Sequence, residues 1–374
     1  MTTTTHHSIK TVLYLGLELS NRSWQIHADT LAQHRHKVLP QPSISALIRE
    51  MDNTKSKLGL PADVPVVICY EAAGDGFWIY RALQAKGIEC LVVDPGSIEV
   101  PRGRKRVKTD RLDCRKLCEQ LIRYHAWGER NALKVVHVPP EQIEDQRRPE
   151  RELDTLTAER TMHINRIRGL LKLHGITVIS FARLRLDKLK DWAGRPLPTH
   201  LHGELSRELE RLSLIDKQVR QLEEQREQRI RAPSTRVDLV MQKLTAVRGI
   251  GSRSAGVLSG EQFGWRDFRN RRQVGAAIGL TGTPYNSGNS SRDQGISKAG
   301  NKRVRFLAIQ LAWRWLANQP HSALSCWYGK RFASGGARAR RTGIVALARK
   351  LMIALWRFAI YDEIPAGAIL KVAA

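Results

Sequence analysis

The sequence predicts a mixed α/β domain at the N-terminus, followed by a mainly α-helical remainder. Strand-like and helix-like runs alternate over residues 8–140, and apolar residues recur at helical spacing over residues 150–232. Helical patterns then continue through residues 238–365. Because 374 residues exceed one typical hydrophobic core, we expect three domains with these boundaries.

The first domain contains five runs rich in aliphatic and β-branched residues, which predict strands. The intervals between them fit helices, above all residues 75–86 and 110–127. Alternation of this kind predicts a mixed sheet with helices on its faces. The predicted strands cover residues 11–19, 23–28, 64–70, 88–93 and 134–138.

The middle region begins with residues 139–151, which open with two prolines and predict a linker. Leucine and isoleucine then recur at spacings of three and four over residues 153–173 and 205–230. The spacing predicts a helical hairpin or coiled coil, interrupted by a loop over residues 175–200. A helix from a second protomer could complete it.

The C-terminal region opens with a predicted helix, a Gly249-Ile-Gly251 turn and another helix, resembling a helix-hairpin-helix element. Such a turn can direct backbone amides at phosphate, although it is also an ordinary helix connection. The flanking Arg248 and Arg253 favour phosphate. Helices are predicted over residues 302–318 and 342–361, and residues 280–300 read as a long loop, which is usually functional or disordered.

The composition points to a polyanionic partner. Lys and Arg number 62 against 36 Asp and Glu, for a formal net charge of +26 and a pI near 10.4. No run approaches the ~18 apolar residues of a membrane span, and no secretory signal is visible. We therefore expect a cytoplasmic protein with a polyanionic partner and no membrane partner.

The five cysteines are an odd number in apolar or helical contexts, which indicates reduced packing residues. Cys114 and Cys118 lack a second Cys/His pair at zinc spacing, so a zinc site is disfavoured.

Basic residues gather at several points that are candidate contacts to a nucleic-acid backbone. Each cluster is equally consistent with a solvated face. Besides the individual residues given next, two basic clusters lie at residues 266–272 and 335–341. The individual candidates are Arg102, Arg104, Lys105, Arg106, Lys108, Arg248, Arg253, Arg292, Lys298, Lys302 and Arg303.

Four acids occupy positions suited to a metal site. Glu18 and Glu71 lie near the ends of predicted strands, and Asp110 and Asp113 share one face of a helical first turn. Either Asp alone could simply cap the helix or pair with a neighbouring arginine. Together the four favour Mg²⁺, or Mn²⁺ in its place, because open α/β sheets hold ligands at strand ends. Two such ions would suit phosphoryl transfer.

A Gly-rich loop over residues 279–305 offers a nucleophile. A serine there, followed by several cations, could attack a phosphodiester while the cations stabilise the developing charge. Tyr285 is a rival nucleophile on the same loop. Composition alone makes either assignment weak.

The motifs occur in an order that resembles the DEDD-type insertion-sequence transposases, also called bridge recombinases. The resemblance runs from about residue 11 to 318. Any one motif is weak, whereas the ordered set is specific. The motifs are Gly16-Leu-Glu-Leu-Ser, Tyr70-Glu71, Val93-Asp-Pro, Lys108-Thr-Asp-Arg-Leu-Asp113, Val247-Arg-Gly-Ile-Gly, Gly279-Leu-Thr, Asn286-Ser-Gly and Gly295-Ile-Ser-Lys-Ala-Gly-Asn.

The resemblance implies a RuvC-like, RNase H-fold domain, a helical coiled-coil middle and a C-terminal transposase domain that supplies a serine. It further implies recombination of an insertion element with target DNA, directed by a structured bridge RNA in a homotetramer, a dimer of dimers. By the same likeness Glu71, Asp110 and Asp113 match the second to fourth acids, and Ser287 matches the nucleophile. The acids of one protomer would act with the serine of another.

One position departs from the family pattern. Glu18 stands where the family typically has Asp, so either the strand has shifted to compensate or this copy is impaired. Ser290 and Ser291 are alternatives to Ser287, although the loop length favours Ser287. Two other functions stay open: a metal-dependent, structure-selective nuclease such as a junction resolvase, and a non-catalytic nucleic-acid-binding protein.

Overall fold

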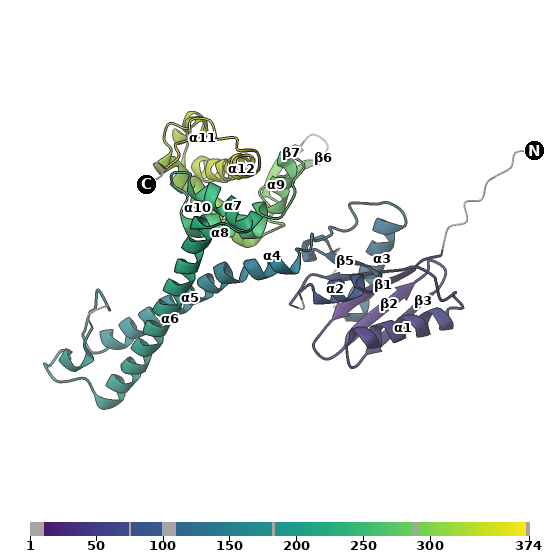
Figure 1. Ribbon diagram of the computed structural model, residues 1–374, viewed down its shortest axis with the longest axis horizontal. Helices are drawn as coiled ribbons and strands as arrows, with labels where there is room; N and C mark the ends of the chain where they lie inside the picture. Colours follow the sequence, from purple (N-terminus) through teal and green to yellow (C-terminus); the bar gives the residue numbers. More distant parts are fainter. Residues whose placement is uncertain (1–10, 75, 99–109, 182–183, 288–289, 372–374) are drawn as a thin grey trace, which may run out of the picture. The chain divides into compact units, whose positions relative to one another are not determined.

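The structure, a computed structural model, describes residues 11–74, 76–98, 110–181, 184–287 and 290–371. Within these ranges the side chains of Asp110 and of residues 284–294 are not described. The chain divides into two compact units, residues 1–138 and 139–374 (Figure 1).

The first unit is built on a five-stranded mixed sheet in the order β3-β2-β1-β4-β5. β1 pairs antiparallel with β2 and parallel with β4, which pairs parallel with β5. Four predicted strands are confirmed, but residues 134–138 form only a single bridge, from Val135 to Val93. The strands are β1 (Leu13–Leu19), β2 (Trp24–Asp29), β3 (His34–Leu39), β4 (Val66–Glu71) and β5 (Glu89–Val93).

Helices cover both faces of this sheet. Alternate residues of a strand point to opposite faces, so Leu13 and Leu15 pack against α1 (Ile44–Lys57) and α2 (Trp78–Gln84). Tyr14 packs on the other face with α3 (Asp110–His125). A short 3-10 helix, Pro95–Ser97, follows β5. This mixed sheet with its helices agrees with the expected RNase H-like architecture.

The second unit begins with helices where a linker was predicted, so that prediction is wrong. Residues 141–146 form α4 (Glu141–Gln146), and α5 (Arg148–Lys172) begins two residues later. The prolines are compatible with helix here because Pro140 precedes α4 and Pro149 lies in the first turn of α5. A proline at a helix start removes no internal hydrogen bond.

The predicted helical hairpin is confirmed as a packed helix pair. α5 and α6 (Thr199–Arg231) lie side by side (Figure 1). Buried leucines and isoleucines, among them Ile167 and Leu205, form a core between them. The connection contains one 3-10 helix, Leu186–Lys188.

The rest of the unit is mainly helical, with one core centred on α10 and α12. A two-stranded antiparallel hairpin replaces the predicted loop at residues 280–300. Repeated exchange of backbone hydrogen bonds sustains it despite the Gly/Ser/Asn composition. The elements are α7 (Arg236–Thr245), α8 (Ser252–Leu258), a π-helix (Ser259–Phe263), α9 (Arg271–Ala277), β6 (Gly282–Ser287), β7 (Ser290–Ile296), α10 (Lys302–Asn318), α11 (Ala323–Tyr328), a π-helix (Gly329–Ala333) and α12 (Ala337–Tyr361).

In the described part of the chain, every helix is too short or too polar to cross a membrane.

Candidate active site

Two of the four predicted acids lie next to each other at the carboxyl edge of the sheet. Leu17 on β1 pairs with Tyr70 on β4, so Glu18 and Glu71 are the next residues along two parallel, hydrogen-bonded strands. Neighbouring strands lie about 4.8 Å apart. Both carboxylates are half-buried. The sheet therefore brings together two oxygen ligands that are 53 positions apart in sequence.

The first turn of α3 lies over the end of β1. The Cys114 thiol donates hydrogen bonds to the Gly16 carbonyl at 2.9 Å and the Gln25 carbonyl at 3.3 Å. Close approach is possible because Gly16 has no Cβ: one built there would lie 2.5 Å from the Cys114 carbonyl oxygen. This contact packs α3 against β1 within one turn of Asp113 and two residues before Glu18.

The two predicted aspartates begin this same helix. Asp110 is the first residue of α3, and its side chain lies outside the described atoms. Asp113 is half-buried, and one of its carboxylate oxygens lies 3.9 Å from the Lys116 ammonium. A contact of that length on a partly exposed pair is weak.

The cysteines around this contact are packing residues, as predicted. Burial raises the pKa of the Cys114 thiol to about 12, so the thiol stays protonated and donates to the β1 backbone. Cys118, one turn later, is completely buried against the same strand. All five cysteines are free, and only Cys326 is exposed.

The donors at this sheet edge suit a hard cation. The described atoms contain no group of three or more His, Cys, Asp or Glu side chains already arranged around one metal position. Glu18 and Glu71 follow paired residues on two parallel strands, Asp113 lies in the first turn of α3, and all three offer carboxylate oxygens. Oxygen-only donor sets are typical of Mg²⁺ and Mn²⁺.

The predicted serine nucleophile lies in the second unit, at the end of a hairpin. Ser287 is the last residue of β6 and pairs with Ser290, the first residue of β7. Ser291 pairs with Asn286, and Tyr285 pairs with Arg292. All the candidate nucleophiles thus lie within three residues of the turn. The backbone places these residues together, and the assignment of Ser287 as the nucleophile stays a prediction.

Two of the predicted nucleic-acid contacts are engaged inside the protein. Arg253 and Arg303 both donate to the carboxylate of Asp154 on α5, at 2.9 Å and 2.5 Å. Arg303 also donates to the Glu150 carbonyl at 2.7 Å. Both arginines thus tie α8 and α10 to α5, a role that sequence reasoning missed because Asp154 lies 99 and 149 positions away.

The other predicted cations differ in exposure and in whether their side chains are described. Arg248, Lys298 and Lys302 are exposed, which leaves them accessible to a phosphate backbone. Arg292 belongs to β7, but its side chain is not described. The basic run 102–108 lies outside the described residues.

The Gly249-Ile-Gly251 turn joins α7 and α8 as predicted, but its surroundings explain it without phosphate. The Arg248 amide donates to the Ile369 carbonyl at 3.1 Å, and the Ile250 amide donates to Val247 at 3.1 Å. Gly249 has φ +92°, and a Cβ there would lie 2.9 Å from Asn318. Chain packing therefore already requires this glycine and occupies two of the amides.

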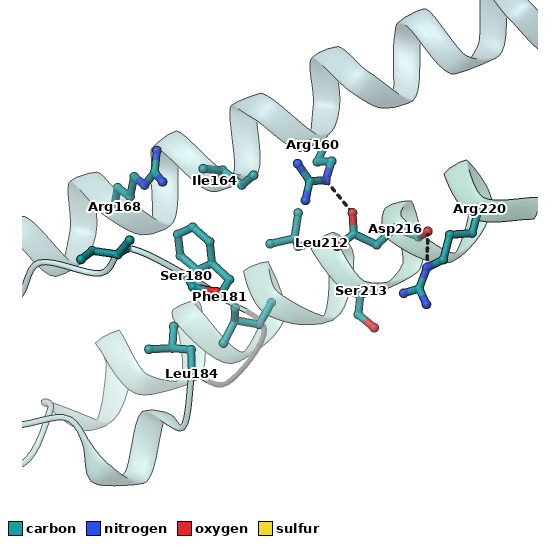
Figure 2. A pocket seen from close by; sticks show the side chains of 12 residues that line it. Arg160, Ile164, Arg168, Ser180, Phe181, Leu184, Leu212, Ser213, Asp216 and Arg220 are labelled. Carbon is teal, nitrogen blue, oxygen red and sulfur yellow. Dashed lines mark hydrogen bonds and ion pairs between the residues drawn. The ribbon is translucent and has the colours of Figure 1, made fainter. Parts of the chain in front are cut away.

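A cavity of about 660 Å³ opens along the α5–α6 pair (Figure 2). Arg160 and Asp216 form an ion pair of 2.6 Å across its wall, and the Arg168 guanidinium lies 5.6 Å from the Phe181 ring centroid. Ile179, also on the lining, is 91% exposed. The connection between α5 and α6 thus exposes apolar surface beside the paired charges of the two helices.

Known proteins match the chain along most of its length. A family model described as "Transposase IS116/IS110/IS902 family" matches residues 241–326, and a DEDD transposase model matches residues 22–176. A putative transposase of Sinorhizobium fredii, y4rJ, is 39% identical over 96% of this chain and 94% of its own length.

Two further relatives are more distant. A probable family 20 transposase of Pseudomonas aeruginosa is 27% identical, covering 79% of this chain and 81% of its own. The transposase for insertion sequence element IS1328 of Yersinia enterocolitica is 23% identical, covering 80% and 83%. With acids at one sheet edge, serines at a hairpin end and a relative aligned along nearly its whole length, the chain belongs to the IS110 family of insertion-sequence transposases, enzymes that act on DNA.

Proposed function

We propose that this transposase exchanges DNA strands between its donor element and a target through a covalent link between DNA and Ser287. The observation that carries the proposal is the separation of two kinds of catalytic group. Carboxylates gather at the edge of the first unit's sheet, whereas the serines lie at a hairpin end in the second unit. A serine that attacks phosphorus conserves the bond energy in an ester for rejoining, which hydrolysis does not.

The DEDD domain implies use of a divalent metal. We propose that Glu18, Glu71, Asp110 and Asp113 hold Mg²⁺, or Mn²⁺ in its place. Support comes from the neighbouring strand ends that carry Glu18 and Glu71 and from the packing of the first turns of α3 on β1. When bound, the metal supplies positive charge to the oxygens of the reacting phosphate. The four acids position that charge, and the half-buried edge limits competing water.

Glu18 is the atypical member of the set. β1 runs regularly through this position, because Glu18 pairs with Gln25 in an unbroken ladder with β2. No bulge in the backbone therefore compensates for the extra methylene group of Glu18. The side-chain torsions of Glu18 must do so instead. This arrangement supports a working but less well-fitted ligand.

We further propose that the protein acts as a homotetramer, a dimer of dimers. Support comes from apolar side chains left exposed on the α5–α6 pair and its connection: Met162 on α5 and Leu214 on α6 are each 57% exposed, and Ile179 in the connection is 91% exposed. Burying such residues against a second copy would remove apolar surface from water. A tetramer would also let the acids of one protomer meet the serine of another.

The proposal includes a structured bridge RNA encoded by the element, which would select the DNA sites by base pairing. The net charge of +26 supports contact with more than one nucleic-acid strand. The choice of RNA rests on the family resemblance, because charge does not distinguish RNA from DNA.

The deciding experiment traps the covalent intermediate. Purified protein, labelled donor and target DNA, the RNA transcribed from the element's flanks and Mg²⁺ are combined, and the products are resolved under denaturing conditions. We expect a protein–DNA adduct that is lost in Ser287→Ala and kept in the matched variants Ser290→Ala and Ser291→Ala.

Each other outcome identifies a different function. An adduct that survives in Ser287→Ala moves the nucleophile to another residue. Cleavage with no adduct in the parent protein identifies a metal-dependent nuclease, because hydrolysis leaves no protein–DNA ester. Binding without any Mg²⁺-dependent strand chemistry identifies a non-catalytic binding protein.

A further inference from the structure

A second cavity, of about 690 Å³, lies at the root of the hairpin that carries Ser287. Leu280 and Ile296 form the hairpin side of the wall, and Trp327 of α11 forms another part. The remaining wall comes from α9 and α12. The volume falls within the ~300–1,000 Å³ of sites that hold small organic groups. We call this cavity the root pocket.

The root pocket is strongly basic. Two arginines of α9 and three cations of α12 line it, and no acidic side chain does. Within the described residues none of these five cations forms an ion pair with a carboxylate, unlike Arg253 and Arg303. The five cations are Arg271, Arg272, Arg341, Arg349 and Lys350. Such a cluster of like charges repels itself unless an anion neutralises it.

Arg349 is the clearest example of a cation without a neutralising partner among the described residues. Its Nε is buried and has no hydrogen-bond partner among the described atoms. A Cβ built on Gly275 of α9 would lie 3.0 Å from that Nε, so the guanidinium lies close against the α9 backbone. A buried donor without a partner is costly, and an anionic ligand would relieve that cost.

The same pocket has an apolar wall suited to a flat ring. Trp327 is half-buried, and the Lys350 ammonium lies 4.7 Å from its ring centroid. Ile296 and Ile353, both partly buried, continue the wall. Aromatic and aliphatic surface beside unpaired cations is the combination that binds a base together with its phosphate.

We infer that the root pocket binds an unpaired nucleotide of single-stranded DNA near the strand that is to be joined. A base within a duplex is stacked and paired, so only an unpaired one can enter. DNA is favoured over RNA because the hairpin that carries Ser287 also forms part of the pocket wall. The inference rests on the proposed function for the identity of the strand.

The hairpin also sets the distance between the two sites. Five residue steps separate Gly282, on the pocket lining, from Ser287. At about 3.3 Å per residue these steps span roughly 17 Å. That length corresponds to about five stacked nucleotides at ~3.4 Å each. The bound nucleotide should therefore lie within about five positions of the phosphate that Ser287 attacks.

Binding is measured in the full-length Ser287→Ala protein, so that the result does not depend on serine chemistry. The probes are a labelled oligothymidine, its RNA counterpart and a duplex, followed by fluorescence anisotropy at several salt concentrations. We expect Trp327→Leu to weaken oligothymidine binding by about 5- to 150-fold, the range found for one stacked base. Arg341→Gln and Arg349→Gln should each reduce the salt-dependence slope by about 0.7.

Two matched variants control for general effects. Trp313→Leu removes a tryptophan of α10 that is 47% exposed and outside the pocket. Arg357→Gln removes an arginine of α12 that pairs with Glu363. Both should bind as the parent does, and all variants should show the parent's thermal unfolding. Iododeoxyuridine placed along the oligonucleotide should crosslink to Trp327, as located by mass spectrometry.

Unchanged affinity in Trp327→Leu and in both arginine variants would overturn the inference, as would crosslinks that avoid the pocket. Preferential binding of the RNA probe through Trp327 would replace DNA by RNA as the occupant, and tighter binding of the duplex would exclude an unpaired nucleotide. If the parent protein forms no covalent adduct but the pocket still binds the oligonucleotide, the proposed function is refuted and the inference about the pocket is not.

Discussion

Replacing Gly16 by alanine tests whether the contact between β1 and α3 positions the acids. The added Cβ would lie 2.5 Å from the Cys114 carbonyl oxygen and 2.8 Å from the Cys118 amide nitrogen. Both are backbone atoms, so no side-chain rotation can relieve the clash. An ordinary contact would require α3 to move away from the sheet by about 1 Å.

That displacement has two calculable consequences. Overpacking of a well-packed core typically costs about 1–3 kcal/mol of unfolding free energy. The same shift moves Asp113 relative to Glu18 and Glu71, whereas Mg²⁺ accepts little departure from ~2.0–2.1 Å ligand distances. Misplacement by about 1 Å lowers a reaction rate by about 10²-fold. We therefore expect activity to fall much further than stability.

The assay compares urea unfolding with the initial rate of Mg²⁺-dependent strand exchange. Gly74→Ala is the matched control, because a Cβ there meets nothing within 4 Å and its backbone is not in the left-handed region. Parent-like rates in Gly16→Ala would refute the reasoning, since α3 would then not set the acid positions. A rate loss explained entirely by the unfolded fraction would equally refute it.

The remaining predictions concern a ligand, a buried charge and the thiols. Glu18→Asp should keep or raise the rate of DNA exchange, and complete loss of exchange would contradict the prediction that Asp fits this ligand position as well as Glu does. Burial alone would raise the pKa of Glu261, but hydrogen bonds and charges from Arg151 and other arginines hold it below its ordinary 4.5. Glu261 therefore contributes stability at neutral pH that is lost as pH falls below 4.5 toward its lowered pKa. Glu261→Gln should cost about 3 kcal/mol near pH 7, and the difference from the parent should shrink in acid; a constant difference in urea unfolding would contradict this. A thiol reagent should label only Cys326 in the native protein, as read by mass spectrometry, and rapid labelling of the buried thiols would contradict the packing described.

The N-terminal sheet was predictable because its central strands are largely apolar up to the acids near their carboxyl ends. β1 and β4 are buried on both faces, and such strands form continuous aliphatic runs. β3 was missed because only Leu39 of its six residues is buried, so its sequence lacks an apolar pattern. It is an edge strand, held mainly by backbone hydrogen bonds to β2.

The sequence predicted where the candidate site residues lie along the strands and helices, but not which of them are neighbours in the fold. The strand-end location of Glu18 and Glu71 follows from the apolar runs that precede them. Their adjacency depends on the parallel register of β1 with β4, which no local pattern specifies. The serine hairpin was read as a loop because backbone pairing, rather than side-chain pattern, defines it.

The sequence did not show which basic side chains are neutralised by a carboxylate in the fold. The structure separates two kinds of basic surface. Arg253 and Arg303 look like nucleic-acid contacts by composition, yet Asp154 neutralises both from a distant helix. Arg341 and Arg349 resemble them locally, but the described residues offer them no carboxylate. A net charge of +26 is the sum of both kinds, and the uncompensated kind attracts an anion. The root pocket, rather than the Gly249–Gly251 turn, is therefore where the second unit's charge favours phosphate most.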